Sequence, residues 1–247
     1  PGTIAQQFLE LPDAVIVSVM RDHQRYFAVR KLDGSLLPTY LNVVNTALAP
    51  ATIAKGNDRV LRARLADAQF FVREDRKVPL ASRIARLDQV TFQTKLGSVG
   101  AKIRRVEQLA RALAPAAGVS VELASQVALL CKMDLDALIV FEFPELQGLM
   151  GRFYALAEGL PAEVADAIAD HYKPTGASDA PAPTALASVV AVADRADTLV
   201  GCFGIGLVPT GSADPFALRR ATLSLVRTAV DGAIDVDITA LLAAAYD

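Results

Sequence analysis

The chain has 247 residues, a net charge of −2 and only two cysteines, Cys131 and Cys202. The length allows a sizeable core, while two cysteines exclude a disulfide framework and a cysteine-based metal cluster. Apolar residues make up 53% of the chain, but we find no run long enough to cross a bilayer and no signal peptide. We therefore expect a mainly helical protein of the cytoplasm that has no membrane partner.

The first 50 residues predict a small β element. Apolar and β-branched runs at 14–20, 26–30 and 40–44 predict three strands, with a turn at 31–35. Three strands bury little surface alone. We expect 1–50 to be the β-rich remnant of a preceding region, and the chain to be an internal fragment of a longer polypeptide.

From residue 51 onward the apolar residues recur at helical spacing. We expect a basic helical connector over 51–90 and a helical domain over 91–247. The expected helices cover the following ranges: one from 51, then 80–87, 97–114, 120–140, 145–157, 161–172 and 184–199, and one or two more after 214.

The segment 193–220 contains an unusual number of residues that end a helix, form a turn or begin the next helix. Asp194 and Asp197 are three residues apart and share one face of a helix. Gly201, Gly204 and Gly206 follow and predict the end of that helix. Asp214 fits the N-cap of the next helix, with Pro215 at its first position. This stretch indicates either a shaped site or a plain corner between two helices.

Charge is distributed unevenly along the chain. Residues 55–105 contain 13 basic and 5 acidic residues, whereas residues 132–218 contain 4 basic and 12 acidic ones. The first segment favours a face that binds a polyanion, although solvated helix faces explain the same pattern.

The sequence contains no complete nucleotide-binding motif, and no residue spacing supports a catalytic triad. Gly201, Gly204 and Gly206 are in the wrong order for a dinucleotide-binding turn and follow a helix instead of a strand. His23 and His171 have no neighbours that indicate a catalytic arrangement, so we expect structural or surface roles for them.

The order of three helical segments resembles the HD superfamily of metal-dependent phosphohydrolases. These are 98–113, 127–135 and 192–195. On this resemblance Lys102, Cys131 and Lys132 stand where the superfamily has metal-binding histidine and aspartate residues, and Asp194 keeps the last ligand position. An ammonium group repels a divalent cation. We therefore expect no metal, and a lysine paired with Asp194 in its place.

Longer strings resemble one family closely, the beta subunit of the bacterial heterotetrameric glycyl-tRNA synthetases. The most specific strings are PELQGLMGRFYA within 141–155 and the whole of 193–220. Further matches are RDHQRYF at 21–27, GNDRVLRARLADAQFF at 56–71, FQTKLGSVGAKIRRVEQLA at 92–110 and HYKP at 171–174.

This resemblance implies an HD-like helical domain that binds tRNA and has an architectural role. It implies a separate alpha subunit that binds ATP and glycine, and glycine tRNA as a partner. The isolated chain would be inactive and would bind no cofactor, and ATP would be used by the whole heterotetramer. The candidate tRNA-binding residues are Arg59, Arg62, Arg64, Arg73, Arg76 and Lys77. An HD-type phosphohydrolase and a purely structural interaction domain remain as alternatives.

Overall fold

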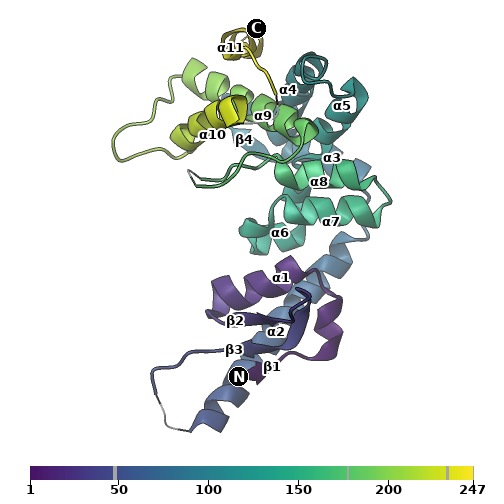
Figure 1. Ribbon diagram of the computed structural model, residues 1–247, viewed down its shortest axis with the longest axis vertical. Helices are drawn as coiled ribbons and strands as arrows, with labels where there is room; N and C mark the ends of the chain where they lie inside the picture. The colour runs from purple at the N-terminus through teal and green to yellow at the C-terminus, as the bar shows by residue number, and fades with distance from the viewer. Residues whose placement is uncertain (47–48, 177, 232–233, 247) are drawn as a thin grey trace. The chain divides into compact units, whose positions relative to one another are not determined.

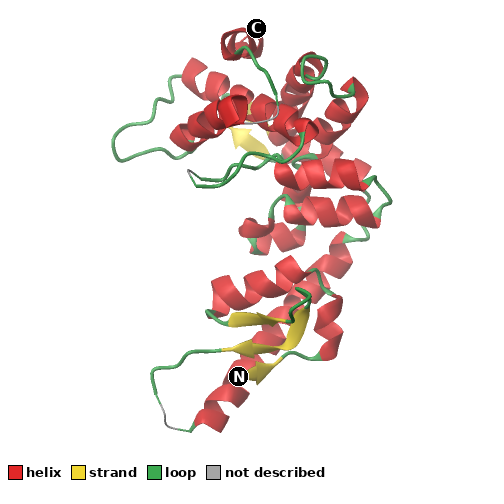
Figure 2. Cartoon of the chain, viewed as in Figure 1, coloured by secondary structure: helices red, strands yellow, loops and turns green. Residues whose placement is uncertain are grey.

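The computed structural model describes residues 1–46, 49–176, 178–231 and 234–246, and for His23 it describes the backbone only. Two compact units are present. Unit 1 comprises Pro1–Val78 and Ala137–Leu146, and unit 2 comprises Pro79–Asp136 and Gln147–Asp247. Most elements in both units are helices, so the prediction of a mainly α protein is confirmed (Figure 2). No helix of the described ranges is long and apolar enough to span a bilayer.

Unit 1 combines a small antiparallel sheet with one long helix. The strands β1 (Gly2–Thr3), β2 (Phe27–Arg30) and β3 (Leu36–Leu41) pair in the order β1-β3-β2 (Figure 1). The helix α2 (Pro50–Asp75) buries a stripe of apolar residues, Leu61, Leu65, Ala68 and Val72. The Tyr40 hydroxyl donates to Asp58 at 2.7 Å and so ties β3 to α2. The remaining elements are η1 (Gln6–Glu10), α1 (Asp13–Ser18), the π-helical turn η2 (Val19–His23), α6 (Leu138–Glu142) and η5 (Pro144–Leu146).

The strand expected at 14–20 is wrong, because these residues form α1 and η2. Val15, Ile16, Val19 and Met20 are all fully buried, a spacing that suits a helix packed on a core. Tertiary burial outweighs the strand preference of β-branched residues here. The strand expected at 40–44 lies earlier, at Leu36–Leu41.

Unit 2 is built from helices and one two-stranded ribbon. Its elements are α3 (Leu80–Arg86), η3 (Leu87–Gln89), β4 (Thr91–Gln93), β5 (Gly97–Ser98), α4 (Val99–Leu113), α5 (Val121–Leu130), η4 (Met133–Asp136), α7 (Leu149–Ala157), α8 (Ala162–Asp170), α9 (Ala185–Gly204), α10 (Leu218–Asp231) and α11 (Ile238–Tyr246). The central helix is α9, which packs against α4, α8 and α10 (Figure 1). Fourteen of its residues are buried.

Side-chain caps fix where the central helices of unit 2 begin. Ser98 accepts the Ala101 N–H at 3.0 Å at the start of α4, and Thr184 accepts the Ala187 N–H at 3.2 Å at the start of α9. Such caps satisfy backbone donors that have no partner within the helix. Gly206, at φ +81°, follows the end of α9, as the glycine pattern predicts.

Two helix predictions need correction. The single helix expected over 120–140 is instead α5, a turn with η4, and α6. Its last part belongs to unit 1, where the Asp75 carboxylate accepts the N–H groups of Leu138 and Ile139 at the start of α6. Pro215 is not the first residue of α10, which begins at Leu218. Asp214 still accepts the N–H groups of Leu218 and Arg219.

The sequence predicted three segments, 1–50, 51–90 and 91–247. The two compact units divide the chain differently, because α2 packs with the N-terminal strands and so belongs to the same unit. The boundaries at 50 and 90 stay predictions. The likeness of unit 2 to the HD superfamily also stays a prediction.

Candidate functional site

A buried cluster of charges lies between α4, α9 and the end of α5 in unit 2. Lys102 extends from α4, Lys132 follows α5, and Asp194 and Asp197 lie on one face of α9. The Lys102 Nζ lies 2.9 Å from Asp194 Oδ1 and 3.0 Å from Asp197 Oδ2. The Lys132 Nζ lies 3.0 Å from Asp194 Oδ2. Both lysines therefore pair with the single carboxylate of Asp194.

Further donors and acceptors complete the coordination of these charges. Lys102 also donates to the Thr198 hydroxyl at 2.7 Å and to the Asp194 carbonyl at 3.1 Å. The Arg105 Nε donates to Asp197 Oδ1 at 2.5 Å from the edge of the cluster. The cluster thus joins α4 to α9 at several points, and charge-assisted bonds of this kind are stronger than neutral ones.

His171 enters the cluster as a neutral acceptor. Its Nδ1 lies 2.6 Å from the Ile168 carbonyl oxygen, which only accepts, so Nδ1 carries the proton. Its Nε2 then accepts from the Lys132 Nζ at 2.8 Å. Burial, with the neighbouring Lys132 charge, holds the pKa of His171 well below its usual range.

The lysines determine the protonation of Asp194. Burial alone would raise the pKa of this carboxyl, but Lys102 and Lys132 outweigh burial and hold its pKa well below the usual range. Burial alone would lower the pKa of Lys102. The carboxylates of Asp194 and Asp197 outweigh burial, so the pKa is raised. The Asp194 carboxylate and the Lys102 ammonium group therefore stay charged near neutral pH.

These residues do not fit a divalent cation. Asp194 already accepts two ammonium groups, and Lys102 and Lys132 have no lone pair to offer while charged. Cys131 is buried, its thiol donates to the Ala128 carbonyl at 3.1 Å, and burial raises its pKa to about 12. Across the described residues, no group of three or more His, Cys, Asp and Glu side chains is arranged to hold a metal ion.

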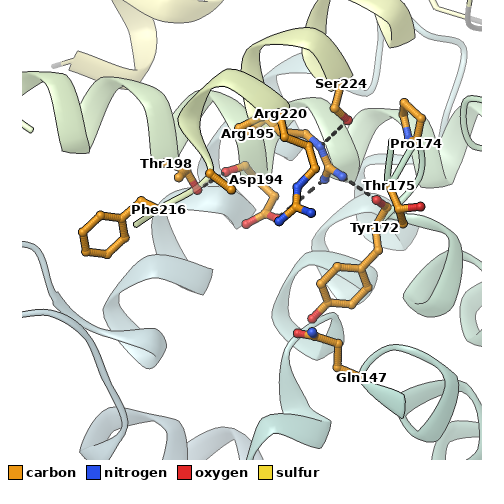
Figure 3. Close-up of a pocket in the computed structure, with 12 residues that line it drawn as sticks. Gln147, Tyr172, Pro174, Thr175, Asp194, Arg195, Thr198, Phe216, Arg220 and Ser224 are labelled. Carbon is orange, nitrogen blue, oxygen red and sulfur yellow. Dashed lines mark hydrogen bonds and ion pairs between the residues drawn. The ribbon is translucent and has the colours of Figure 1, made fainter. Parts of the chain in front are cut away.

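A pocket of about 390 Å³ opens beside the cluster. It lies between α9, the start of α10 and the segment after α8, and Figure 3 shows Asp194, Arg195 and Arg220 among the side chains that line it. Arg195 is buried and donates to the Ser224 hydroxyl and to the carbonyls of His171 and Tyr172, each at 2.7 Å. Arg195 therefore holds the segment after α8 against α9 and α10.

The six basic residues proposed for tRNA contact all lie in unit 1, on α2 or directly after it. At 100° per residue, five of them fall within an arc of about 100° of the helix surface, whereas Arg64 falls outside it. The five are Arg59, Arg62, Arg73, Arg76 and Lys77, and all five are exposed. Those on α2, from Arg59 to Arg73, extend over about 21 Å of helix at 1.5 Å per residue, and Arg76 and Lys77 follow the helix directly. We call these five residues the basic face.

The residues of the basic face differ in their partners. Lys77 pairs with Glu74 at 2.7 Å, and Arg73 lies 3.5 Å from the same carboxylate and over the Phe70 ring. Arg59, Arg62 and Arg76 form no ion pair with any described residue. Arg64, on the other flank, pairs with Glu142 of α6 at 3.3 Å. A groove of about 640 Å³ lies beside Arg73, Arg76 and Lys77.

The sequence pattern brought Lys102, Lys132 and Asp194 to one place, and the structure forms both ion pairs with Asp194. It did not indicate His171, Arg195 or Asp134 as neighbours. Asp134 is fully buried and accepts the N–H groups of Gly148 and Gly151. None of the three stands out in the sequence, because each has charged neighbours: Asp170 and Lys173 beside His171, Asp194 and Asp197 beside Arg195, and Lys132 and Asp136 beside Asp134.

Comparison with known proteins identifies the family. The family model described as "Glycyl-tRNA synthetase beta subunit" matches residues 1–247. The glycine–tRNA ligase beta subunit of Trichlorobacter lovleyi is 48% identical over 247 residues, which are 98% of this chain and 35% of that protein. That of Phenylobacterium zucineum is 52% identical over 236 residues, 93% of this chain and 35% of that protein.

The match covers nearly the whole of this chain but only part of each relative. The beta subunit of Janthinobacterium sp. is 48% identical over 245 residues, which are 99% of this chain and 35% of that protein. The chain spans about a third of the length of the curated relatives it matches. A family model that covers every residue of the chain settles its membership: the chain belongs to the glycyl-tRNA synthetase beta subunit family.

Proposed function

We propose that this chain is the part of a glycine–tRNA ligase that holds glycine tRNA by its phosphates, through the basic face of α2. The observation that carries this proposal is the exposure of Arg59, Arg62 and Arg76 without an acidic partner among the described residues. An unpaired guanidinium on a surface neutralises phosphate without first breaking an ion pair. Family membership supplies the context, because the relatives are named as glycine–tRNA ligase beta subunits.

Contacts with phosphates determine what role the basic face can have. Phosphate contacts fix the position and orientation of a nucleic acid but do not read its bases. The basic face would therefore place the tRNA, while the ATP-dependent formation of glycyl-tRNA takes place with the alpha subunit in a cytoplasmic heterotetramer. We assign no catalytic residue to this chain, and we expect the chain alone not to aminoacylate.

Unit 2 would then have an architectural role. Its charge cluster joins α4, α9 and the end of α5 through buried pairs. On the resemblance to the HD superfamily, its two lysines stand at positions where a phosphohydrolase has metal ligands. Because this donor set does not fit a divalent cation, we do not propose phosphohydrolase activity.

A subunit contact is the second candidate for the basic face. Val60 and Phe70 are 46% and 47% exposed among the basic residues of α2. Exposed apolar side chains with arginine are typical of protein interfaces. The same arginines would then pair with acidic groups of another subunit and not with phosphates.

Salt dependence separates the two candidates. The affinity of the complete protein for glycine tRNA is measured over a series of salt concentrations, for the wild type and for Arg62→Gln. If Arg62 contacts a phosphate, the variant loses about one unit from the slope of log K against log salt. Arg111→Gln is the matched control, because Arg111 is an exposed arginine of α4 in unit 2.

The results have distinct meanings. A lower slope for Arg62→Gln and an unchanged slope for Arg111→Gln support tRNA contact. Equal slopes for all three proteins, combined with weaker association of Arg62→Gln with the alpha subunit, assign the basic face to a subunit interface and overturn the proposal.

A further inference from the structure

The pocket beside the charge cluster of unit 2 has no role in the function proposed above. It is concave, holds about 390 Å³, and is lined by residues from α9, α10 and the segment after α8 (Figure 3). This volume is within the range of small-molecule sites.

Cations outnumber carboxylates around this pocket. Lys102, Lys132, Arg105 and Arg195 belong to the cluster behind it, and Arg220 is at its rim. Four carboxylates lie among or beside them, those of Asp194, Asp197, Asp134 and Asp214. Because charges in a poorly solvated site are screened weakly, the one positive charge that remains unmatched favours a bound anion.

Arg220 is the cation best placed to contact a ligand. It is exposed, lines the pocket and forms no ion pair or hydrogen bond with a described residue. Arg195, in contrast, already donates to Ser224, His171 and Tyr172 and contributes mainly its charge. Arg220 therefore offers the free, planar set of donors that suits a phosphate group.

Neutral donors and aromatic rings complete the lining. The Tyr172 hydroxyl is buried without a hydrogen-bond partner among the described residues. The Ser224 hydroxyl accepts from Arg195, which leaves its own proton to donate. The rings of Tyr172 and Phe216 supply apolar surface for a flat group.

We infer that this pocket binds a nucleoside phosphate, with the phosphate on Arg220 and the base against the aromatic side of the lining. The ligand is either a free nucleotide or the phosphorylated terminal nucleotide of an RNA strand, since both present the same groups. Unit 2 alone supplies all the lining residues, so the inference is independent of the basic face.

The test uses the complete protein that carries this chain, purified without other subunits, and calorimetry at low salt. The probes are AMP, adenosine, inorganic phosphate and a short RNA with and without a 5′-phosphate. Two variants are compared, Arg220→Gln and Arg219→Gln. Arg219 is the matched control, because it is exposed and adjacent but donates to the Thr210 carbonyl outside this pocket. Circular dichroism checks that both variants fold.

We expect AMP to bind at least about tenfold more tightly than adenosine or inorganic phosphate, as one lost charge-assisted contact predicts. Arg220→Gln should remove this advantage and Arg219→Gln should keep it. Tighter binding of the phosphorylated RNA than of AMP, again sensitive to Arg220→Gln, assigns the pocket to a strand end, and the reverse order assigns it to a free nucleotide. The inference is overturned if no probe saturates the protein, if adenosine binds as well as AMP, or if both variants weaken binding equally.

Discussion

The cations of α2 and those of unit 2 contrast within one chain. On α2 and directly after it, Arg59, Arg62 and Arg76 are exposed and have no acidic partner among the described residues. In unit 2, Lys102 and Lys132 are buried, and their ammonium groups lie 2.9–3.0 Å from carboxylate oxygens. The same type of side chain is thus free to meet a ligand in one region and committed to the fold in the other.

Solvation explains the difference. An exposed cation keeps its water, so leaving it unpaired costs little, and an exposed pair contributes only about 0–1 kcal/mol. A buried cation has lost its water, so removing its partner leaves an uncompensated charge that costs several kcal/mol. We therefore expect substitutions in the buried charge cluster of unit 2 to act on folding and substitutions of the exposed cations of α2 to act on binding.

The largest effect is expected for Asp194→Asn. The substitution keeps the size of the side chain but removes the charge that both Lys102 and Lys132 share. We expect the free energy of unfolding to fall by about 3–5 kcal/mol, as for other broken buried ion pairs. Denaturant unfolding at pH 7 measures this loss.

Asp166→Asn is the control for that measurement. Asp166 pairs with Arg152 at 2.5 Å, but both side chains are nearly half exposed. We expect a loss of about 1 kcal/mol or less. If both variants lost the same free energy of unfolding, burial would not be the reason why the ion pairs of the unit 2 cluster stabilise the fold.

An intermediate effect, dependent on pH, is expected at Asp134. Burial raises the pKa of this carboxyl to about 6, although the N–H groups of Gly148 and Gly151 oppose the shift. Between about pH 4 and 6 the folded protein therefore binds a proton that the unfolded chain has released, and stability falls as the pH rises. Asp194, whose pKa is depressed, has the opposite sign and loses its contribution only at low pH.

Asp134→Asn removes the titration while keeping an acceptor for both N–H groups. Relative to the wild type, the variant should become more stable between pH 4 and 7, by an amount on the order of 3 kcal/mol. Unfolding curves at several pH values measure this difference. Parallel curves for the two proteins over this range would show that Asp134 does not titrate there.

Much of the helical architecture could be predicted from the sequence, because apolar spacing and caps are local. The long helix from residue 51 and the helix that contains Asp194 are examples. The segment 14–20 could not be assigned correctly, since a short buried apolar run is compatible with either a strand or a helix. The break after α5 also escaped prediction, because it depends on a distant carboxylate, Asp75, at the start of α6.

The cluster was predictable only in part, for a similar reason. Lysines at 102 and 132 predicted a pair with Asp194 in place of a metal, and the ion pairs follow from opposite charges that share a core. The neutral His171 that accepts from Lys132 depends on the Ile168 carbonyl, which no pattern of residue types reveals. The roles of the six basic residues of 59–77 stay predictions.

The smallest effect on folding is expected for Arg62→Gln on α2. Arg62 is exposed and has no ion-pair partner among the described residues, so its removal breaks no ion pair or hydrogen bond with them. We expect the free energy of unfolding to change by no more than about 0.5 kcal/mol, with little dependence on salt. Denaturant unfolding at low and high salt measures this change. Because Gln keeps the helix preference of Arg, a larger loss would mean that the arginine is committed to the fold as the lysines of unit 2 are. Arg62 is the residue for which we most clearly expect an effect on binding without an effect on stability. A large loss of stability there would therefore contradict the contrast between the two regions.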